Sequence, residues 1–341
     1  MPQKTALRQN DENAWLEWVR RQVRPAAAGG LRLGIGDDAA IVRPRGGWEI
    51  AVTTDLMIDG THFRRGVDRP EDCGYRLAMR GLSDLAAMGA EPWMLFFSAL
   101  WPKDEPPAWR RSVHRGLTQA AHAAGATLAG GDVSSGVHAC FDIVALGQIP
   151  RGEALRRDGA RPGDRIFVSG TLGQAAWGRQ MLDHGHIPQN PRERSALRRC
   201  QRPCARWELG QKLRGLASAA MDLSDGLSSD LDRLCAASGV HARVDETSLP
   251  LASPAGMGQN FLALALHGGE DYELLFTVPR RKLAALTQRT GASIQLTEIG
   301  EILPVRRARK SQPRLWLQAE NGQSQPLAPQ GWDALRSHTR H

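Results

Sequence analysis

Aspartate recurs beside glycine or a small hydroxyl residue in six short segments of this 341-residue chain, each expected at the end of a helix or strand. The segments are Gly34–Ala39, Thr53–Asp55, Ser83–Asp84, Gly130–Asp132, Asp222–Gly226 and Gly268–Asp271. One such segment alone is usually a turn, because aspartate bonds its own backbone and glycine tolerates a positive φ. Their recurrence along the chain favours a fold that gathers distant segments into one acidic site.

Carboxylates gathered in one site repel one another, and this repulsion must be offset. Two carboxylates about 4 Å apart repel by roughly 4 kcal/mol at an effective dielectric constant near 20. Several of them can share a site only if divalent cations bind or if their pKa values rise. The chain has no GxxxxGK[ST] loop, and none of the six segments contains lysine. Mg²⁺ binds through a few carboxylates together with substrate phosphates. We therefore predict a site with several metal ions that handles phosphate.

The first segment also fits the GxGxxA pattern of a dinucleotide-binding turn. That turn requires a helix after the glycines, so that the helix N-terminus faces the pyrophosphate. Here the residues 39–42 are followed by Pro44 and predict a strand. The adjacent Asp37 and Asp38 would also repel a pyrophosphate. A Rossmann-type site is therefore not expected.

The chain length predicts two domains. Residues 150–164 are rich in proline, glycine and arginine, and we place the boundary there, giving domains 1–149 and 150–341. Before the boundary we expect helices at 13–24 and 70–89, with strands at 39–42, 48–53 and 139–149. After it we expect strands at 165–168, 219–223, 241–245 and 272–278, with helices between them, including 227–237. No repeat of fixed period is present, so two α+β domains are predicted.

Composition is that of a chain with a packed core, since 41% of residues are hydrophobic and 23% are charged. The longest apolar stretch, Trp93–Trp101, is about half the length that crosses a bilayer. The first residues lack the apolar stretch of a signal peptide, so a cytoplasmic protein is expected. Its five cysteines are expected to be reduced. Cys200 and Cys204, with His184 and His186 upstream, are poorly spaced for a zinc site.

The net charge of +8 raises the possibility of a nucleic-acid partner. The excess lies in residues 192–214 and 306–314, outside the acidic segments. Aromatic residues do not alternate with the basic ones, as they do on a single-strand stacking surface. We expect neither a nucleic-acid nor a membrane partner, and interpret these segments as solvated helix faces and a basic tail. The rival hypothesis is a nucleotide-binding regulatory or nucleic-acid-binding protein.

The six acidic segments, together with Gly60–Phe63, resemble the thiamine-monophosphate kinase family and occur in its order from about residue 30 to about residue 280. A weaker match, Gly331–Asp333, lies near the end of the chain. Single motifs are shared with aminoimidazole ribonucleotide synthetase and selenophosphate synthetase. The combination of Gly60–Phe63 with Gly269–Leu274 is what distinguishes the kinase.

The resemblance implies ATP-dependent phosphorylation of thiamine monophosphate to thiamine diphosphate by direct in-line transfer. It also implies the aminoimidazole ribonucleotide synthetase-like fold, in a homodimer whose N-terminal domains pair their sheets in a barrel, with several Mg²⁺ ions and ATP as co-substrate. The acceptor is already an ionised phosphate, so no catalytic residue is expected beyond the metal ligands. The alternative within the superfamily is another ATP-dependent synthetase.

The resemblance also assigns roles to residues. Expected metal ligands are Asp38, Thr53, Thr54, Asp55, Asp84, Asp132, Asp222 and Asp225. Expected ATP contacts are Gly131, Arg157 and Ser224. Expected contacts to thiamine monophosphate are His62, Glu270 and Trp332.

Each role has an ordinary structural alternative. Arg157 is typical of a solvated loop, His62 of a packed histidine and Trp332 of a surface tryptophan. We interpret Asp230 and Asp232 as charges on a helix surface.

Overall fold

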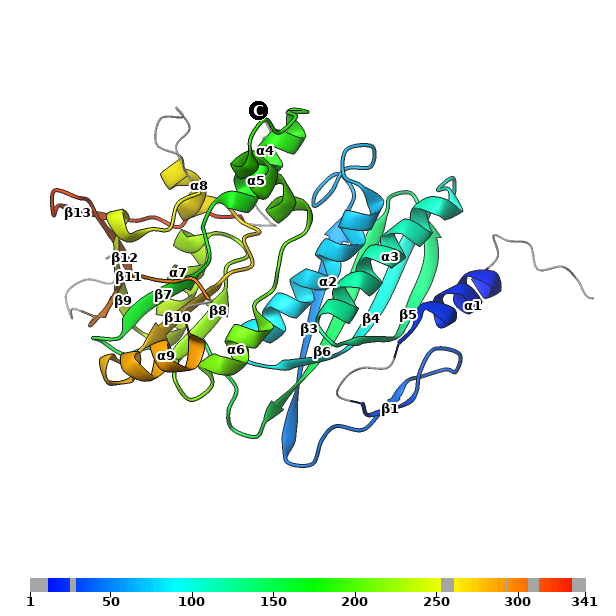
Figure 1. The fold of residues 1–341 in the computed structure, drawn as a ribbon, viewed down its shortest axis with the longest axis horizontal. Coiled ribbons are helices and arrows are strands. Elements are labelled where there is room, and N and C mark those ends of the chain that lie inside the picture. The colour runs from blue at the N-terminus through cyan, green and yellow to red at the C-terminus, as the bar shows by residue number, and fades with distance from the viewer. Residues whose placement is uncertain (1–11, 25–28, 253–260, 292–293, 306–312, 333–341) are drawn as a thin grey trace, which may run out of the picture. The chain divides into compact units, whose positions relative to one another are not determined.

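The computed structural model describes residues 12–24, 29–252, 261–291, 294–305 and 313–332 (Figure 1). It divides into two compact units. The N-terminal unit comprises residues 1–85 and 90–152, and the C-terminal unit comprises residues 86–89 and 153–341. The prediction of a mixed α/β fold in two domains is confirmed.

The N-terminal unit is built on a four-stranded sheet with the order β3-β6-β4-β5. Strands β4 and β5 are parallel, and the other neighbouring pairs are antiparallel. Its elements are α1 (Glu12–Gln22), β1 (Leu31–Leu33), β2 (Ile41–Val42), β3 (Trp48–Ile58), α2 (Pro70–Ala87), β4 (Glu91–Pro102), α3 (Pro107–Ala123), β5 (Thr127–Gly136) and β6 (Cys140–Pro150). Figure 1 shows α2 and α3 lying together across one face of this sheet.

Two glycines allow α2 and α3 to approach closely. A Cβ atom on Gly74 of α2 would lie 1.8 Å from the carbonyl oxygen of Val113. A Cβ atom on Gly116 of α3 would lie 1.7 Å from the carbonyl oxygen of Glu71. The two helices therefore touch backbone to backbone, which only glycine permits at these positions.

The opposite face of the sheet carries apolar side chains. At one end the β1–β2 hairpin packs on Met94 and Phe96. Along β3, Ile50, Val52 and Leu56 remain 41%, 63% and 44% exposed. Large exposed apolar surfaces of this kind mark interaction sites.

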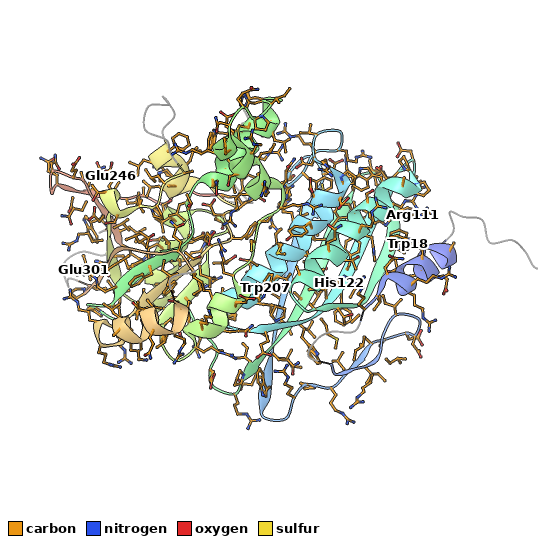
Figure 2. The ribbon with its side chains drawn as sticks, in the orientation of Figure 1. Trp18, Arg111, His122, Trp207, Glu246 and Glu301 are labelled. Atoms are coloured by element: carbon orange, nitrogen blue, oxygen red, sulfur yellow. The ribbon has the colours of Figure 1, made fainter. Side chains whose placement is uncertain are left out.

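Helix α1 contributes two tryptophans to an aromatic cluster with α3. The rings of Trp15 and Trp18 lie 5.7 Å and 5.0 Å from the ring of His114. The guanidinium of Arg111 lies 6.0 Å from the centre of the Trp18 ring, and Figure 2 labels both residues. The predicted helix at 13–24 is therefore present and is held by aromatic contacts.

The C-terminal unit is built on a seven-stranded mixed sheet with the order β13-β12-β9-β11-β7-β10-β8. Its strands are β7 (Arg165–Ser169), β8 (Ala219–Asp222), β9 (His241–Asp245), β10 (Leu274–Val278), β11 (Leu296–Leu303), β12 (Leu315–Gln318) and β13 (Ser324–Pro326). Its helices are α4 (Gln174–Asp183), α5 (Pro191–Gln201), α6 (Trp207–Leu213), α7 (Leu227–Ser238), α8 (Phe261–His267) and α9 (Leu283–Thr290), with short 3-10 turns at Glu246–Ser248 and Arg280–Lys282.

Both faces of this sheet are buried. In β7, Ile166 and Val168 belong to the apolar core that includes α7 and α8. The intervening Phe167 belongs to a second core that includes α6 and α9, where it stacks on Phe276 with ring centres 5.6 Å apart. The two cores follow from the alternation of side chains along each strand.

The element boundaries correct two expectations. Thr53–Asp55 lies inside β3, and Gly130–Asp132 lies inside β5, so neither segment stands at the end of an element. The strand continues through these residues because each pairs in register with a neighbouring strand, which overrides their turn preference. In the part of the chain that the structure describes, no helix is both long and apolar enough to cross a membrane.

Candidate functional site

In the N-terminal unit, acidic side chains of β3 and α2 meet on the helix-covered face of the sheet. The Oγ1 of Thr53 donates to Oδ2 of Asp84 at 2.5 Å. The carboxylate of Asp55 pairs with Arg80 at 3.1 Å. Burial raises the pKa of Asp55, the charge of Asp84 raises it further, and Arg80 opposes the shift. These contacts bring together two segments that lie far apart in the sequence.

A third carboxylate, Asp142 of β6, was not identified from the sequence. It pairs in register with Leu56, so the alternation of side chains places it on the uncovered face of the sheet, opposite to that of Asp55. Its Oδ1 accepts from Oγ1 of Thr54 at 2.9 Å, and its charge also raises the pKa of Asp55. Asp142 pairs in register with Ser98, which pairs in turn with Asp132. Asp132 therefore lies in the same row two strands away, at about 10 Å. Asp142 lies beside neither a glycine nor a small hydroxyl residue, so it does not fit the pattern of the six acidic segments.

The Gly34–Ala39 segment forms a tight turn in the loop between β1 and β2. The backbone N–H of Asp38 donates to Oδ1 of Asp37 at 2.9 Å. The side chain of Asp38 is exposed. Among the described residues, Asp38 belongs to no group of three or more histidine, cysteine, aspartate or glutamate side chains that could hold a metal ion.

His62 lies in a well-anchored turn after β3. Its Nδ1 accepts from the backbone N–H of Ile58 at 3.1 Å, so the neutral ring carries its proton on Nε2. Its carbonyl oxygen accepts from the buried guanidinium of Arg76 at 2.8 Å. The adjacent Phe63 is buried and stacks on Phe141 with ring centres 5.2 Å apart. The turn therefore holds His62 in one orientation and one tautomer.

In the C-terminal unit, the loop from Asp222 to Gly226 joins β8 to α7. One oxygen of Asp230, Oδ2, accepts from three successive backbone N–H groups at 3.1, 3.0 and 3.1 Å, those of Ser224, Asp225 and Gly226. Asp230 is fully buried, which corrects its interpretation as a surface charge. Burial raises the pKa of Asp230 to about 6, and the charge of Asp225 adds to this shift.

Arg233 links the two carboxylates of this loop region. Its Nη1 lies 2.5 Å from Oδ2 of Asp225 and 2.6 Å from Oδ1 of Asp230. Asp232, by contrast, lies near the surface and pairs with Arg314 at 2.9 Å. Only one of these two helix aspartates therefore faces the loop.

The segment around Glu270 runs alongside the same loop. The backbone N–H of Glu270 donates to the carbonyl of Ser224 at 2.8 Å, and that of Tyr272 donates to the carbonyl of Leu223 at 2.9 Å. Glu270 and Tyr272 have φ angles of 67° and 49°, a left-handed conformation that is strained for non-glycine residues. Backbone strain of this kind is typical of functional sites.

Two buried acids anchor this strained segment. Asp271 accepts from the backbone N–H groups of Gly173 at 2.7 Å and Ala175 at 3.1 Å, at the start of α4. Burial raises the pKa of Asp271 to about 7. Glu273 is 1% exposed and pairs with Arg206 at 2.5 Å. The anchors fix the backbone on either side of Tyr272.

Trp332 returns to the same loop. Its backbone N–H donates to the carbonyl of Asp225 at 3.0 Å. A Cβ atom on the preceding Gly331 would lie 2.2 Å from that carbonyl, so glycine permits the approach. The backbone N–H of Gly331 donates to Oγ of Ser229 at 2.9 Å. Gly331 and Trp332 of the three-residue sequence match thus lie beside the Asp222–Gly226 loop, and Asp333 lies outside the described residues.

Arg157 lies elsewhere in the C-terminal unit. Its carbonyl oxygen accepts from Oγ of Ser238, the last residue of α7. The loop from Asp222 to Gly226 precedes the first residue of the same helix, so the rise along α7 separates the two places by about 17 Å. The Arg157 side chain is exposed. The structure therefore does not place Arg157 beside Ser224.

The donor set suits Mg²⁺. Each unit presents carboxylate and hydroxyl oxygens, which are the hard ligands that Mg²⁺ takes together with phosphate oxygens. Among the described residues, no three histidine, cysteine, aspartate or glutamate side chains are gathered as a metal-binding group. The residues therefore fit an ion that binds through one or two carboxylates and completes its shell with water and substrate.

Comparison with known families matches both units. Residues 36–149 match the AIR synthase related protein, N-terminal domain, and residues 161–310 match the AIR synthase related protein, C-terminal domain.

Individual relatives give a more specific similarity than these two domain families. A thiamine-monophosphate kinase of Salmonella typhimurium is 41% identical over 280 residues, which is 80% of this chain and 84% of the relative. The crystal structure of a thiamine-monophosphate kinase from Stenotrophomonas maltophilia is 36% identical with a TM-score of 0.78, covering 86% of this chain and 95% of that one. A solved structure of AaThiL complexed with AMPPCP and TMP is 31% identical with a TM-score of 0.74, covering 87% of this chain and 91% of that one.

Proposed function

The chain belongs to the thiamine-monophosphate kinase family, and we propose that it phosphorylates thiamine monophosphate with ATP, by direct in-line transfer, to give thiamine diphosphate. One observation in the structure supports this most. Three segments that are distant in sequence, at Asp222–Gly226, Gly269–Tyr272 and Gly331–Trp332, are joined by backbone hydrogen bonds in one unit. These segments carry residues assigned to metal, nucleotide and acceptor.

Mg²⁺ is the proposed cofactor. In the N-terminal unit the assigned ligands are Asp38, Thr53, Thr54, Asp55, Asp84 and Asp132, and in the C-terminal unit they are Asp222 and Asp225. When bound, the ions neutralise the charge on the phosphate oxygens during a loose transition state. The chain's own carboxylates supply the ligands, and the contacts of Thr53 and Thr54 orient two of the acids of the N-terminal unit.

ATP contacts are proposed for Gly131, Ser224 and Arg157. At Gly131 a Cβ atom would lie 1.9 Å from the carbonyl oxygen of Phe97, and φ is 147°, so the position requires glycine. Such bare backbone allows a phosphate to approach closely. The exposed guanidinium of Arg157 offers a planar fork of donors for phosphate oxygens.

The acceptor is proposed to contact His62, Glu270 and Trp332. His62 is set to donate from Nε2, because its Nδ1 already accepts a hydrogen bond. Thiamine carries a cationic thiazolium ring, which an indole face and a carboxylate both attract. Trp332 is 37% exposed, so its ring is accessible to a ligand.

A homodimer is proposed from the uncovered sheet face of the N-terminal unit. Ile50, Val52 and Leu56 form an apolar stripe on β3, and alternate residues of that strand face the helices. Two copies of such a face can pack together to form a barrel-like pair of sheets. The stripe would then be buried in the assembly.

The test is an acceptor assay with product identification. The protein is incubated with ATP and Mg²⁺ together with thiamine monophosphate, with thiamine, or with no acceptor, and the products are separated. Thiamine diphosphate and ADP in equal amounts, formed only with thiamine monophosphate, are the expected result. ATP consumption without thiamine diphosphate would instead support another synthetase of the superfamily.

A further inference from the structure

The loop that carries Asp222, Ser224 and Asp225 is held by a side chain that none of the assigned roles includes. Asp230, one turn into α7, reaches back and accepts three successive backbone N–H groups on a single oxygen. Its other oxygen accepts from Arg233 at 2.6 Å. Because the carboxylate is fully buried, these donors replace the water that it has lost.

This contact goes beyond ordinary helix capping. A capping residue inside the first turn reaches one backbone N–H at the cap position. Asp230 binds the cap residue Gly226 and also the two residues before it. Three N–H groups that converge on one point form the arrangement that binds anions in many proteins. Here a side chain occupies that arrangement, so the loop offers its side chains rather than its amides to a ligand.

Arg233 connects Asp230 to Asp225, which is an assigned metal ligand. Its Nη1 lies between Asp230 and Asp225 and within 2.6 Å of both. The carboxylate of Asp225 is therefore located by the same group that neutralises Asp230. Movement of Asp230 would release the backbone of the loop and the Asp225 side chain together.

We propose that Asp230 is a positioning residue for phosphoryl transfer, fixing Ser224 and Asp225 in the geometry that receives Mg²⁺ and ATP. This inference rests on the proposed function and deepens it. It assigns Asp230 no contact with metal, nucleotide or acceptor.

The test compares Asp230→Asn with Asp232→Asn, the same change two residues along the same helix. In Asp230→Asn one end of the side chain is an NH₂ group, which must face either the three N–H donors or Arg233. We expect the Mg²⁺ concentration for half-maximal activity to rise by about 10- to 100-fold, as for other groups that orient metal ligands. The KM for ATP should rise with it, and the KM for thiamine monophosphate should change much less. Asp232→Asn should match the wild type in all three constants.

A measurement without turnover accompanies the kinetics. The shift in melting temperature caused by Mg²⁺ with a non-hydrolysable ATP analogue should be reduced in Asp230→Asn and retained in Asp232→Asn. If Asp230→Asn lowers the melting temperature but leaves half-saturating Mg²⁺ and the ligand-induced shift unchanged, the role is only structural and the proposal is wrong. Equal effects in both variants would also overturn it.

If Asp230→Asn does not fold, hydrogen exchange on the wild type still tests the proposal. The proposal requires the N–H groups of residues 224–226 to be protected from exchange in the ligand-free protein, as bonded amides are. Exchange at the rate of an open loop would refute it. A wild type that binds Mg-nucleotide but makes no thiamine diphosphate would refute the proposed function and leave the positioning role standing.

Discussion

Among the proposed metal ligands, Asp132 can be substituted with the least effect on the fold, because its side chain is exposed and its loss removes no core contact. We predict that Asp132→Asn lowers kcat by at least about 100-fold, since groups that stabilise transition-state charge are commonly worth about 3 kcal/mol. Circular dichroism and the melting temperature should be unchanged. Asp104→Asn, at another exposed position, is the control. Near-normal turnover of Asp132→Asn at saturating Mg²⁺ would remove Asp132 from the ligand set.

A substitution of Trp332 tests its assignment as a contact to the acceptor. Its tie to the loop is made by its backbone N–H, so Trp332→Ala retains that bond and removes only the ring. A cation over an indole is worth about 0.5 to 2 kcal/mol, so the KM for thiamine monophosphate should rise roughly 2- to 30-fold. The KM for ATP should stay constant. A parallel rise in both constants, with a lower melting temperature, would show a structural tryptophan instead.

The predicted residues show what a sequence motif can locate. Glu270 and Trp332 were assigned by resemblance, and the structure places both beside Ser224 and Asp225 through the backbone. Asp142 was missed as a site residue because it lies beside neither a glycine nor a small hydroxyl residue, whereas Asp230 follows Ser229 and was interpreted as a charge on a helix surface. The location of Asp142 depends on the register between strands, and the reach of Asp230 depends on the path of the loop before its helix. The first property is not local in sequence, and the second is set by the backbone conformation of a segment of a few residues.

At the scale of elements, the contact between α2 and α3 gives a prediction whose sign opposes helix propensity. Alanine normally stabilises a helix relative to glycine by about 1 kcal/mol. At Gly74, however, the added Cβ would lie 1.8 Å from the backbone of α3. We therefore expect Gly74→Ala to lower the free energy of unfolding by about 3 kcal/mol, measured in urea. Gly46→Ala, where a Cβ meets nothing within 4 Å, is the control. A stabilised Gly74→Ala would contradict the close contact.

The aromatic cluster between α1 and α3 should make stability depend on pH. Burial lowers the pKa of His114 to about 4, from an ordinary value of 6.5. Between these values the unfolded chain binds a proton that the folded protein does not, so stability falls as the pH falls through this range. From about pH 7.5 to about pH 5 the free energy of unfolding falls by about 2 kcal/mol through this group.

A neutral replacement isolates that effect. Urea unfolding of His114→Gln at both pH values should show a loss smaller than that of the wild type by about 2 kcal/mol. If both proteins lose the same stability on acidification, His114 is not buried as the neutral ring.

The helices and the strands of alternating pattern could be predicted, whereas β5 could not. Helix α2 begins at Pro70, which has the fixed φ of a first helical residue, and the strand expected at 139–149 appears as β6. Strand β5 contains Gly130 and Gly131, which locally favour a turn. Its pairing with β4 supplies hydrogen bonds that the segment alone cannot make. Tertiary contacts, rather than propensity, decide such a segment.

At the scale of the whole molecule, part of the basic excess has a structural role. Arg199 and Arg206, in the basic segment 192–214, pair with the buried Glu273 at 3.2 Å and 2.5 Å. They are therefore more than a solvated helix face. Residues 306–312 of the second basic segment lie outside the residues that the structure describes. The absence of a nucleic-acid partner stays a prediction.

The uncovered sheet face of the N-terminal unit leads to a prediction about the assembly of the protein. Val52 lies in the middle of the apolar stripe of β3 and is 63% exposed in the single chain. A lysine there would remain solvated in a monomer but would have to be buried in the proposed dimer, at a cost of several kcal/mol. We expect the wild type to sediment as a dimer and Val52→Lys as a folded monomer. Val137→Lys, at a position 79% exposed in the β5–β6 connection, should leave the dimer intact. A monomeric wild type would contradict the proposed dimer, and a Val52→Lys protein that still sediments as a dimer would place the partner surface elsewhere.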